Sequence, residues 1–136
     1  MKRQAIAIWK GSIQNGEGTL SSQSEVLQHT PFTFKSRFEE GSGTNPEELI
    51  AASHAGCFAM QLTAFLTEED YDPERLEAKG EVTLENGIIT SSHITLTAKI
   101  DTIKHDKFKE LVQKAKTNCP ISKLLNTEIK VDATLI

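Results

Sequence analysis

The sequence predicts an α+β fold that is rich in strands and organised around one central buried helix. Residues 49–66 run without a charged side chain, and a helix that is apolar on all sides must be enclosed by the rest of the molecule. The segments before and after it alternate apolar and polar residues with the two-residue period of a β-strand. With 136 residues, the chain is long enough for a single domain, residues 1–136, with its own core.

The first two predicted strands form a hairpin. Residues 4–9 alternate, with Ile6 and Ile8 on one face. An Asn-Gly pair at residues 15–16 is a typical turn signal, and a weaker strand follows at residues 19–22. We therefore expect two antiparallel strands joined by this turn.

A third strand is predicted after Pro31. Phe32, Phe34 and Phe38 would then lie on one face, and Arg37 would point to the other. On spacing alone, Arg37 is a solvated arginine on the outer side of that strand.

The central helix has a clear start signal. Asn45 is a good N-cap, Pro46 fits the first helical position, and Glu47 and Glu48 occupy the first turn. The plain role of either glutamate is to favour the positive end of the helix dipole, an effect worth about 0.3–1 kcal/mol. The helix carries several residues with small or no side chains, namely Ala51, Ala52, Ala55 and Gly56. They make the helix thin and allow close approach of a second helix, which a second subunit could supply.

A membrane-spanning interpretation of residues 49–66 is weaker than a buried helix. The stretch is at the lower length limit for a span, and acidic residues flank both ends. It also contains polar side chains, namely Ser53, His54, Gln61 and Thr63. We therefore expect no membrane partner.

The second half of the chain predicts a long hairpin, a helix and a last strand. Residues 77–85 alternate, an Asn-Gly pair turns the chain, and residues 94–100 return. An amphipathic helix is then indicated by apolar residues three and four positions apart: Phe108, Leu111, Val112 and Ala115. Asn118 can end this helix, Pro120 can begin a short one, and residues 129–135 alternate as a strand.

Charge and composition exclude some function classes. The net charge is −4 and no basic patch stands out, so nucleic acid is not an expected partner. The N-terminal residues lack the apolar segment and cleavage site of a signal peptide. With only two cysteines and no export signal, we expect a cytoplasmic protein whose thiols are kept reduced.

The two cysteines, Cys57 and Cys119, are the candidates for chemistry. They form no Cys-x-x-Cys motif, and the four scattered histidines give no zinc-ligand spacing. Cys57 can be a small buried hydrophobe. Cys119 directly precedes a predicted helix, where the dipole stabilises a thiolate, although cysteine can also simply occupy a cap. His54, three residues before Cys57, can be a general base or a histidine satisfied by packing or water.

Four segments together resemble the OsmC/Ohr family of osmotically inducible and organic hydroperoxide resistance proteins. They are Arg37-Phe38-Glu39, the run Thr-Asn-Pro-Glu-Glu-Leu at residues 44–49, Gly56-Cys57-Phe58, and Asn-Cys-Pro-Ile-Ser-Lys at residues 118–123. The resemblance covers nearly the whole chain in order. It is closer to the OsmC branch, because residues 11–18 lack the arginine of the other branch and Arg37 fills the OsmC-like position.

The resemblance implies the roles of four residues and the assembly. Cys57 matches the peroxidatic cysteine and Cys119 the resolving cysteine. Arg37 matches the arginine that activates the thiolate, and Glu47 the carboxylate that orients this arginine. The implied OsmC-like fold is an intertwined homodimer, in which sheets wrap two central helices and both subunits line each active site.

The implied activity is that of a thiol-dependent peroxidase. Organic hydroperoxides, and less efficiently hydrogen peroxide, would be reduced to alcohols through a Cys57 sulfenic acid and a Cys57–Cys119 disulfide. An external dithiol would restore the thiols, with a lipoyl group as a candidate, and neither metal nor organic cofactor is needed.

The chemistry requires help for Cys57. Burial favours the protonated thiol, whereas a guanidinium within about 4–6 Å lowers a thiol pKa by about one to three units. Glu47 can hold Arg37 bidentately, and we expect Phe58, Met60 and nearby phenylalanines to form an apolar wall for the organic tail.

Three other functions remain open from the sequence. The first is a non-catalytic protein that binds a lipid or another small molecule on the same scaffold. The second is a structural dimeric stress protein. The third is a thiol-dependent hydrolase, which would need His54 as its base and an orienting partner that the sequence does not indicate.

Overall fold

The computed structural model describes residues 1–136 as two compact units, Met1–Leu49 and Ile50–Ile136. It contains both helices and strands, which confirms the predicted α+β class. The long helix α2, Pro46–Glu68, begins in the first unit and continues into the second. The prediction of a single domain stays a prediction.

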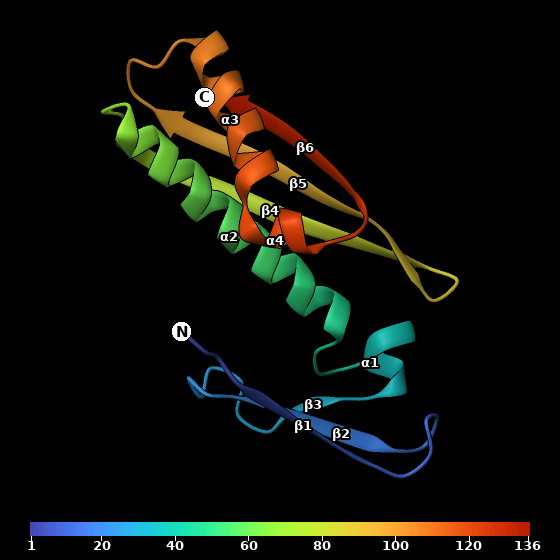
Figure 1. Ribbon diagram of the computed structural model, residues 1–136. Helices are drawn as coiled ribbons and strands as arrows, with labels where there is room; N and C mark the ends of the chain where they lie inside the picture. Colours follow the sequence, from blue (N-terminus) through green and yellow to red (C-terminus); the bar gives the residue numbers. More distant parts are fainter. The chain divides into compact units, whose positions relative to one another are not determined.

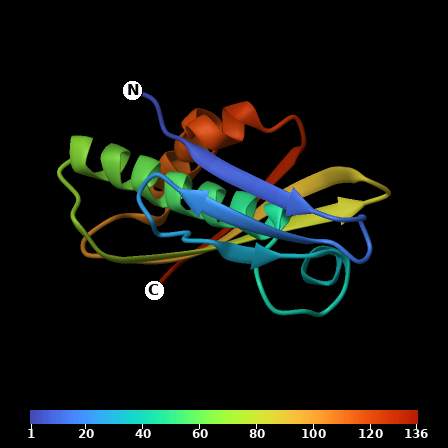
Figure 2. The same ribbon diagram turned by 90° about the horizontal axis from the view of Figure 1, so that it is seen from below.

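The first unit contains a three-stranded antiparallel sheet in the order β1-β2-β3 (Figure 2). The strands are β1, Ala5–Lys10, β2, Glu17–Ser22, and β3, Thr30–Phe32. The predicted hairpin of β1 and β2 is confirmed. Gly18 is required where these strands meet, because a Cβ there would lie 2.5 Å from the Phe32 ring.

The predicted third strand is too long. β3 ends at Phe32, and a short helix, α1, Phe34–Phe38, follows it, so Arg37 lies on a helix. The cause is a capping box: Thr33 Oγ1 accepts from the Ser36 N–H at 3.2 Å, and Ser36 Oγ accepts from the Thr33 N–H at 2.8 Å. Phe34 and Phe38 are four residues apart, and their ring centroids lie 4.9 Å apart as neighbours on one helix face.

The start of α2 agrees with the sequence. Oδ1 of Asn45 accepts a hydrogen bond from the Glu48 N–H at 2.7 Å, which confirms Asn45 as the N-cap. Pro46 is the first helical residue, and both glutamates lie in the first turn. The helix is therefore capped by the residues that the sequence indicates.

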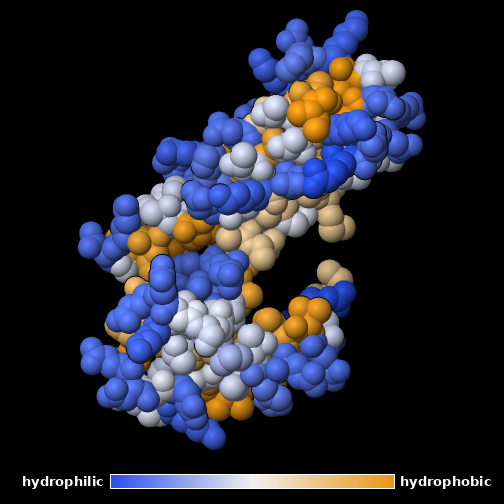
Figure 3. All heavy atoms as spheres, turned by 180° about the vertical axis from the view of Figure 1, so that it is seen from behind, coloured by the Kyte–Doolittle hydropathy of each residue, from blue (hydrophilic) through white to orange (hydrophobic).

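The second unit is a sheet with helices on one face (Figure 1). Its strands are β4, Pro73–Glu85, β5, Ile88–Ile100, and β6, Glu128–Leu135, in the order β4-β5-β6. β4 and β5 form the predicted hairpin, and β6 lies parallel to β5. Figure 3 shows hydrophilic residues over most of the opposite face of this sheet.

The helices of the second unit bury one continuous core against the sheet. α3, His105–Asn118, buries the four apolar residues that predicted it: Phe108, Leu111, Val112 and Ala115. α4, Pro120–Leu124, begins at the predicted proline. The α2 side chains in this core are Phe58, Leu62, Phe65 and Leu66, which meet Ile94, Leu96 and Ala98 of β5.

Helix α2 is buried on one face only within the single chain, and its predicted cover by a second subunit stays a prediction. His54 is buried with the four α2 core residues, but the opposite face of the helix is open, and Met60 is 76% exposed. By length and composition alone, α2 could also span a membrane. Within the single chain, α2 therefore buries one face and exposes the other, although its sequence is apolar on all sides.

Candidate active site

The two cysteines lie side by side in the second unit. Cys57 is half-buried on α2, and Cys119 is fully buried between α3 and α4. Both are free thiols, and their Sγ atoms lie 3.0 Å apart. They meet because α2, α3 and α4 cover the same face of the β4-β5-β6 sheet (Figure 1). The fold thus joins two thiols that are far apart in the sequence.

The surroundings of Cys57 act on its thiol in opposite directions. Burial, first, and the contact with Cys119 raise the pKa of the Cys57 thiol, whereas a hydrogen bond from the backbone N–H of Ile121 lowers it. The balance is a raised pKa. Within this unit, Cys57 therefore favours the protonated form, and a positive group is still needed to make it a nucleophile at neutral pH.

His54 lies in the interior beside the thiol pair. It is fully buried, Nδ1 lies 2.6 Å from Oγ of Ser92, and Nε2 lies 2.8 Å from Oγ of Ser122. Burial lowers the pKa of His54, so the ring is neutral. Neither ring nitrogen is hydrogen-bonded to Cys57, which does not support a role for His54 as the base of a thiol hydrolase.

Sequence reasoning missed the two serines. Ser92 lies on the inner face of β5, and Ser122 lies on α4, three residues after Cys119. One signal was available: His54 precedes Cys57 by the same three-residue spacing with which Ser122 follows Cys119. On two helices that bring the cysteines together, this spacing brings the histidine and the serine together as well.

Arg37 and Glu47 form an ion pair in the first unit. Nε and Nη2 of Arg37 both donate to Oε1 of Glu47, at 3.2 and 2.9 Å. The expectation that both carboxylate oxygens hold the guanidinium is wrong, because Oε2 of Glu47 is buried and has no hydrogen-bond partner. The Glu47 side chain is 13% exposed and that of Arg37 is 40% exposed. The guanidinium thus remains accessible to a further group.

A set of loop hydrogen bonds brings these two residues together. Oγ of Ser36 donates to the carbonyl oxygen of Thr44 at 2.8 Å, and Nδ2 of Asn45 donates to the carbonyl oxygen of Ser36 at 3.0 Å. The Thr44 N–H donates to the Pro31 carbonyl oxygen at 3.0 Å. Gly43, with a φ of +103°, allows this return, because a Cβ there would lie 2.3 Å from the Pro31 oxygen. The end of α1 is thereby fixed to the start of α2.

An aromatic groove adjoins the Arg37 guanidinium. Its volume is about 240 Å³, and it is lined by Trp9, Ile13, Phe32, Thr33, Phe34, Arg37 and Phe38. The guanidinium carbon lies 5.0 Å from the centroid of the Phe38 ring, within the range of a cation–π contact. The expected wall at Phe58 is wrong, because Phe58 is fully buried in the core of the second unit, while Met60 is on the surface.

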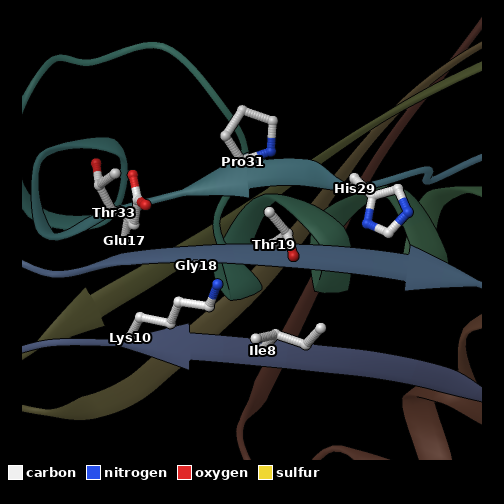
Figure 4. Close-up of a pocket in the computed structure, with 8 residues that line it drawn as sticks. All are labelled: Ile8, Lys10, Glu17, Gly18, Thr19, His29, Pro31 and Thr33. Atoms are coloured by element: carbon white, nitrogen blue, oxygen red, sulfur yellow. The ribbon is translucent and has the colours of Figure 1, made fainter.

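A second hollow of about 400 Å³ lies on the other face of the β1-β2-β3 sheet (Figure 4). Its lining mixes charged, polar and apolar side chains: Ile8, Lys10, Glu17, Gly18, Thr19, His29, Pro31 and Thr33. It contains none of the four predicted site residues. No group of three His, Cys, Asp or Glu residues is placed to hold a metal ion.

The predicted site residues therefore form two pairs, one in each unit. Cys57 meets Cys119, and Arg37 meets Glu47. Their roles in chemistry, and the action of Arg37 on Cys57, stay predictions.

Known proteins resemble this chain along almost its full length. A model of the OsmC-like protein family matches residues 39–134. Peroxiredoxin OsmC of Escherichia coli K12 is 39% identical, over 98% of this chain and 96% of that protein. The organic hydroperoxide resistance protein OhrB of Bacillus subtilis is 30% identical, over 85% of this chain and 88% of that protein. The crystal structure of OhrB has a TM-score of 0.68 and 26% identity, covering 98% of both chains. The chain therefore belongs to the OsmC-like family.

Proposed function

We propose that the protein is a cysteine-based, thiol-dependent peroxidase that reduces organic hydroperoxides, and less efficiently hydrogen peroxide, to alcohols and water. The observation that carries the proposal is the pair of free thiols, with Sγ atoms 3.0 Å apart. The names of the relatives, peroxiredoxin OsmC and organic hydroperoxide resistance protein, support the same chemistry.

The proposed cycle has three steps. The Cys57 thiolate attacks the terminal oxygen of the hydroperoxide, the O–O bond breaks, and the alkoxide leaves with a proton as the alcohol. Cys57 is then a sulfenic acid. The Cys119 sulfur attacks the Cys57 sulfur, the S–O bond breaks, and water leaves as the disulfide forms. A dithiol reductant, for which a lipoyl group is suited, exchanges with the disulfide and restores both thiols.

Arg37 is assigned the activation of Cys57. A guanidinium beside the sulfur opposes the effect of burial and donates hydrogen bonds to the developing alkoxide. Glu47 fixes the direction of the guanidinium through one oxygen, and the exposed part of Arg37 is left to meet substrate and thiolate. The groove beside Arg37 supports a preference for organic hydroperoxides, because hydrogen peroxide has no tail to bury there.

The proposed assembly is a homodimer in which both subunits contribute to each active site. The open face of α2 supports it, because Ala52, Gly56 and Met60 are exposed and a Cβ at Gly56 would meet no atom within 4 Å. Ile6 and Ile8 are also exposed, at 64% and 46%. A second copy of the chain would cover such apolar faces. We propose that this dimer works in the cytoplasm, where dithiol reductants maintain free thiols.

The decisive experiment measures peroxide consumption by cysteine variants. Cys57→Ser should abolish turnover of cumene hydroperoxide. Cys119→Ser should still consume about one equivalent per site and then fail to recycle with dihydrolipoamide. Wild-type single-turnover consumption by Cys57→Ser would overturn the proposal. A wild-type protein that forms no Cys57–Cys119 disulfide with stoichiometric hydroperoxide would instead favour a non-catalytic binding protein.

A further inference from the structure

His54 connects the helix of Cys57 to the helix that follows Cys119. Its ring lies on α2, three residues before Cys57, and Nε2 lies 2.8 Å from Oγ of Ser122 on α4. On its other side, Nδ1 lies 2.6 Å from Oγ of the fully buried Ser92 on β5. A neutral imidazole has one donor and one acceptor, and a hydroxyl can complement either. The ring can thus form a hydrogen bond with each serine hydroxyl, and these two bonds link β5, α2 and α4.

The bond between His54 and Ser122 adds a polar contact to a short helix that is otherwise held by the packing of Ile121 against the core and by the buried Cys119 that precedes it. None of the five residues of α4 is fully buried. Besides the Ser122 bond, the polar contacts between α4 and α2 go to the Cys57 sulfur: the Ile121 N–H donates to it, and Cys119 Sγ, just before α4, lies 3.0 Å from it. Both change when that sulfur is oxidised. The bond from His54 to Ser122 involves no reacting atom and can persist.

We propose that His54 is a positioning residue that, through Ser122, holds Cys119 against Cys57 for disulfide formation. The inference rests on the proposed peroxidase function. In the step concerned, Cys119 sulfur forms a bond with Cys57 sulfur, the S–O bond of the sulfenic acid breaks, and the oxygen leaves as water with the Cys119 proton. Without the Ser122 bond, α4 and Cys119 move away from Cys57 for a larger fraction of the time.

The test compares two serine variants that each remove one hydroxyl from the same histidine. Ser122→Ala breaks the connection to α4, whereas Ser92→Ala breaks the connection to β5 and leaves α4 attached. After one equivalent of cumene hydroperoxide, stopped-flow mixing with a sulfenic-acid trap gives the rates of Cys57 oxidation and of disulfide formation. We expect Ser122→Ala to oxidise at the wild-type rate and to form the disulfide about tenfold more slowly, in line with one lost hydrogen bond.

The controls separate positioning from stability. Ser92→Ala should unfold at lower urea concentration but still form the disulfide at a rate within about twofold of wild type. Ser122→Thr should form the disulfide at the wild-type rate. The reason is the same in both variants, because each keeps a hydroxyl at position 122. Disulfide formation by Ser122→Ala at the wild-type rate would overturn the proposal. Equal slowing in Ser92→Ala would also overturn it, since the effect would then follow core stability.

A second measurement keeps this inference independent of the peroxide reaction. In glutathione redox buffers, the disulfide requires α4 to stay against α2, where the His54–Ser122 bond can form, whereas the two thiols can also separate and lose this bond. The bond therefore stabilises the disulfide more than it stabilises the pair of thiols. Ser122→Ala should therefore shift the Cys57–Cys119 equilibrium toward the thiols by up to about tenfold. If wild type consumes no hydroperoxide but this shift occurs, the peroxidase proposal fails and the positioning role stands. If wild type is an active peroxidase and neither rate nor equilibrium changes, the positioning role fails alone.

Discussion

Arg37 binds Glu47 through a single carboxylate oxygen, while the other oxygen, Oε2, is buried with no hydrogen-bond partner. The pair is partly exposed, and exposed ion pairs add little to stability, in the range of about 0–1 kcal/mol. An interaction that stabilises so little but fixes the direction of a cation is better explained by orientation than by folding.

Glu47→Gln should separate these two effects. Glutamine keeps the shape and one acceptor but loses the charge that orients Arg37, so we expect kcat/KM for cumene hydroperoxide to fall at least about tenfold, as expected for one misplaced transition-state donor. The free energy of unfolding should change by less than about 1 kcal/mol. Glu48→Gln is the matched control, because Glu48 also lies in the first turn of α2 but accepts from Thr44. Equal losses in both variants would contradict the orienting role of Glu47.

Arg37→Ala should change the pH dependence of Cys57 labelling. Burial already raises the pKa of the Cys57 thiol, and loss of a nearby cation raises it further. In a Cys119→Ser background, the midpoint of the alkylation rate should therefore move to higher pH by about one unit or more. Lys35→Ala, on the same short helix, is the control for loss of a positive charge. A midpoint that stays in place in Arg37→Ala would remove Arg37 from the activation of Cys57.

The sequence predicted elements best where local signals agreed. The hairpin of β4 and β5, the cap at Asn45 and the restart at Pro120 each depend on residues close in sequence. The predicted third strand was too long because Phe34 and Phe38, four residues apart, fit both the two-residue period of a strand and the 3.6-residue period of a helix. Spacing alone could not choose between them, and the reciprocal bonds of Thr33 and Ser36 decided for a helix.

The site was predicted less completely than the elements. The three-residue spacing of His54 and Ser122 from the two cysteines is the one sequence signal for their contact, and no local pattern indicates Ser92 or the unpaired oxygen of Glu47. The contacts of His54 depend on how α2, α4 and β5 pack against one another in the second unit. The position of the Glu47 oxygen depends on the folded loop in the first unit. Phe58 shows the same limit, because an apolar residue beside a candidate catalytic cysteine can face either a pocket or the core.

The free energy of unfolding should decrease as the pH is lowered, because His54 is buried in its neutral form. Burial lowers the pKa of His54 in the folded protein, so between that value and about pH 6.5 the unfolded chain binds a proton that the folded chain does not. Above this window there is no difference, and within it the free energy of unfolding falls by up to about 1.4 kcal/mol per pH unit. Urea titrations at pH 7.5 and 5.5 should show the loss.

Two variants check that the acid effect belongs to this histidine. His54→Gln cannot take up the proton, so its stability should depend less on pH over the same window. His105→Gln removes an exposed histidine at the start of α3 and should keep the wild-type dependence. Identical pH dependence in His54→Gln and wild type would contradict the assignment.

Gly56→Leu tests what covers the open face of α2. A Cβ at Gly56 meets nothing within 4 Å in the chain itself, and replacing glycine inside a helix usually stabilises it by about 0.5–1 kcal/mol. For an isolated chain, the variant should therefore be neutral or more stable. In the proposed homodimer, leucine would stand where the partner's helix approaches, and sedimentation equilibrium should show a shift from dimer to monomer. Lys109→Leu, which adds an exposed leucine on α3, should leave the dimer intact. If Gly56→Leu associates as tightly as wild type, this face of α2 is not the dimer contact, because a side chain of that size could not be accommodated in a close helix pair without weakening it.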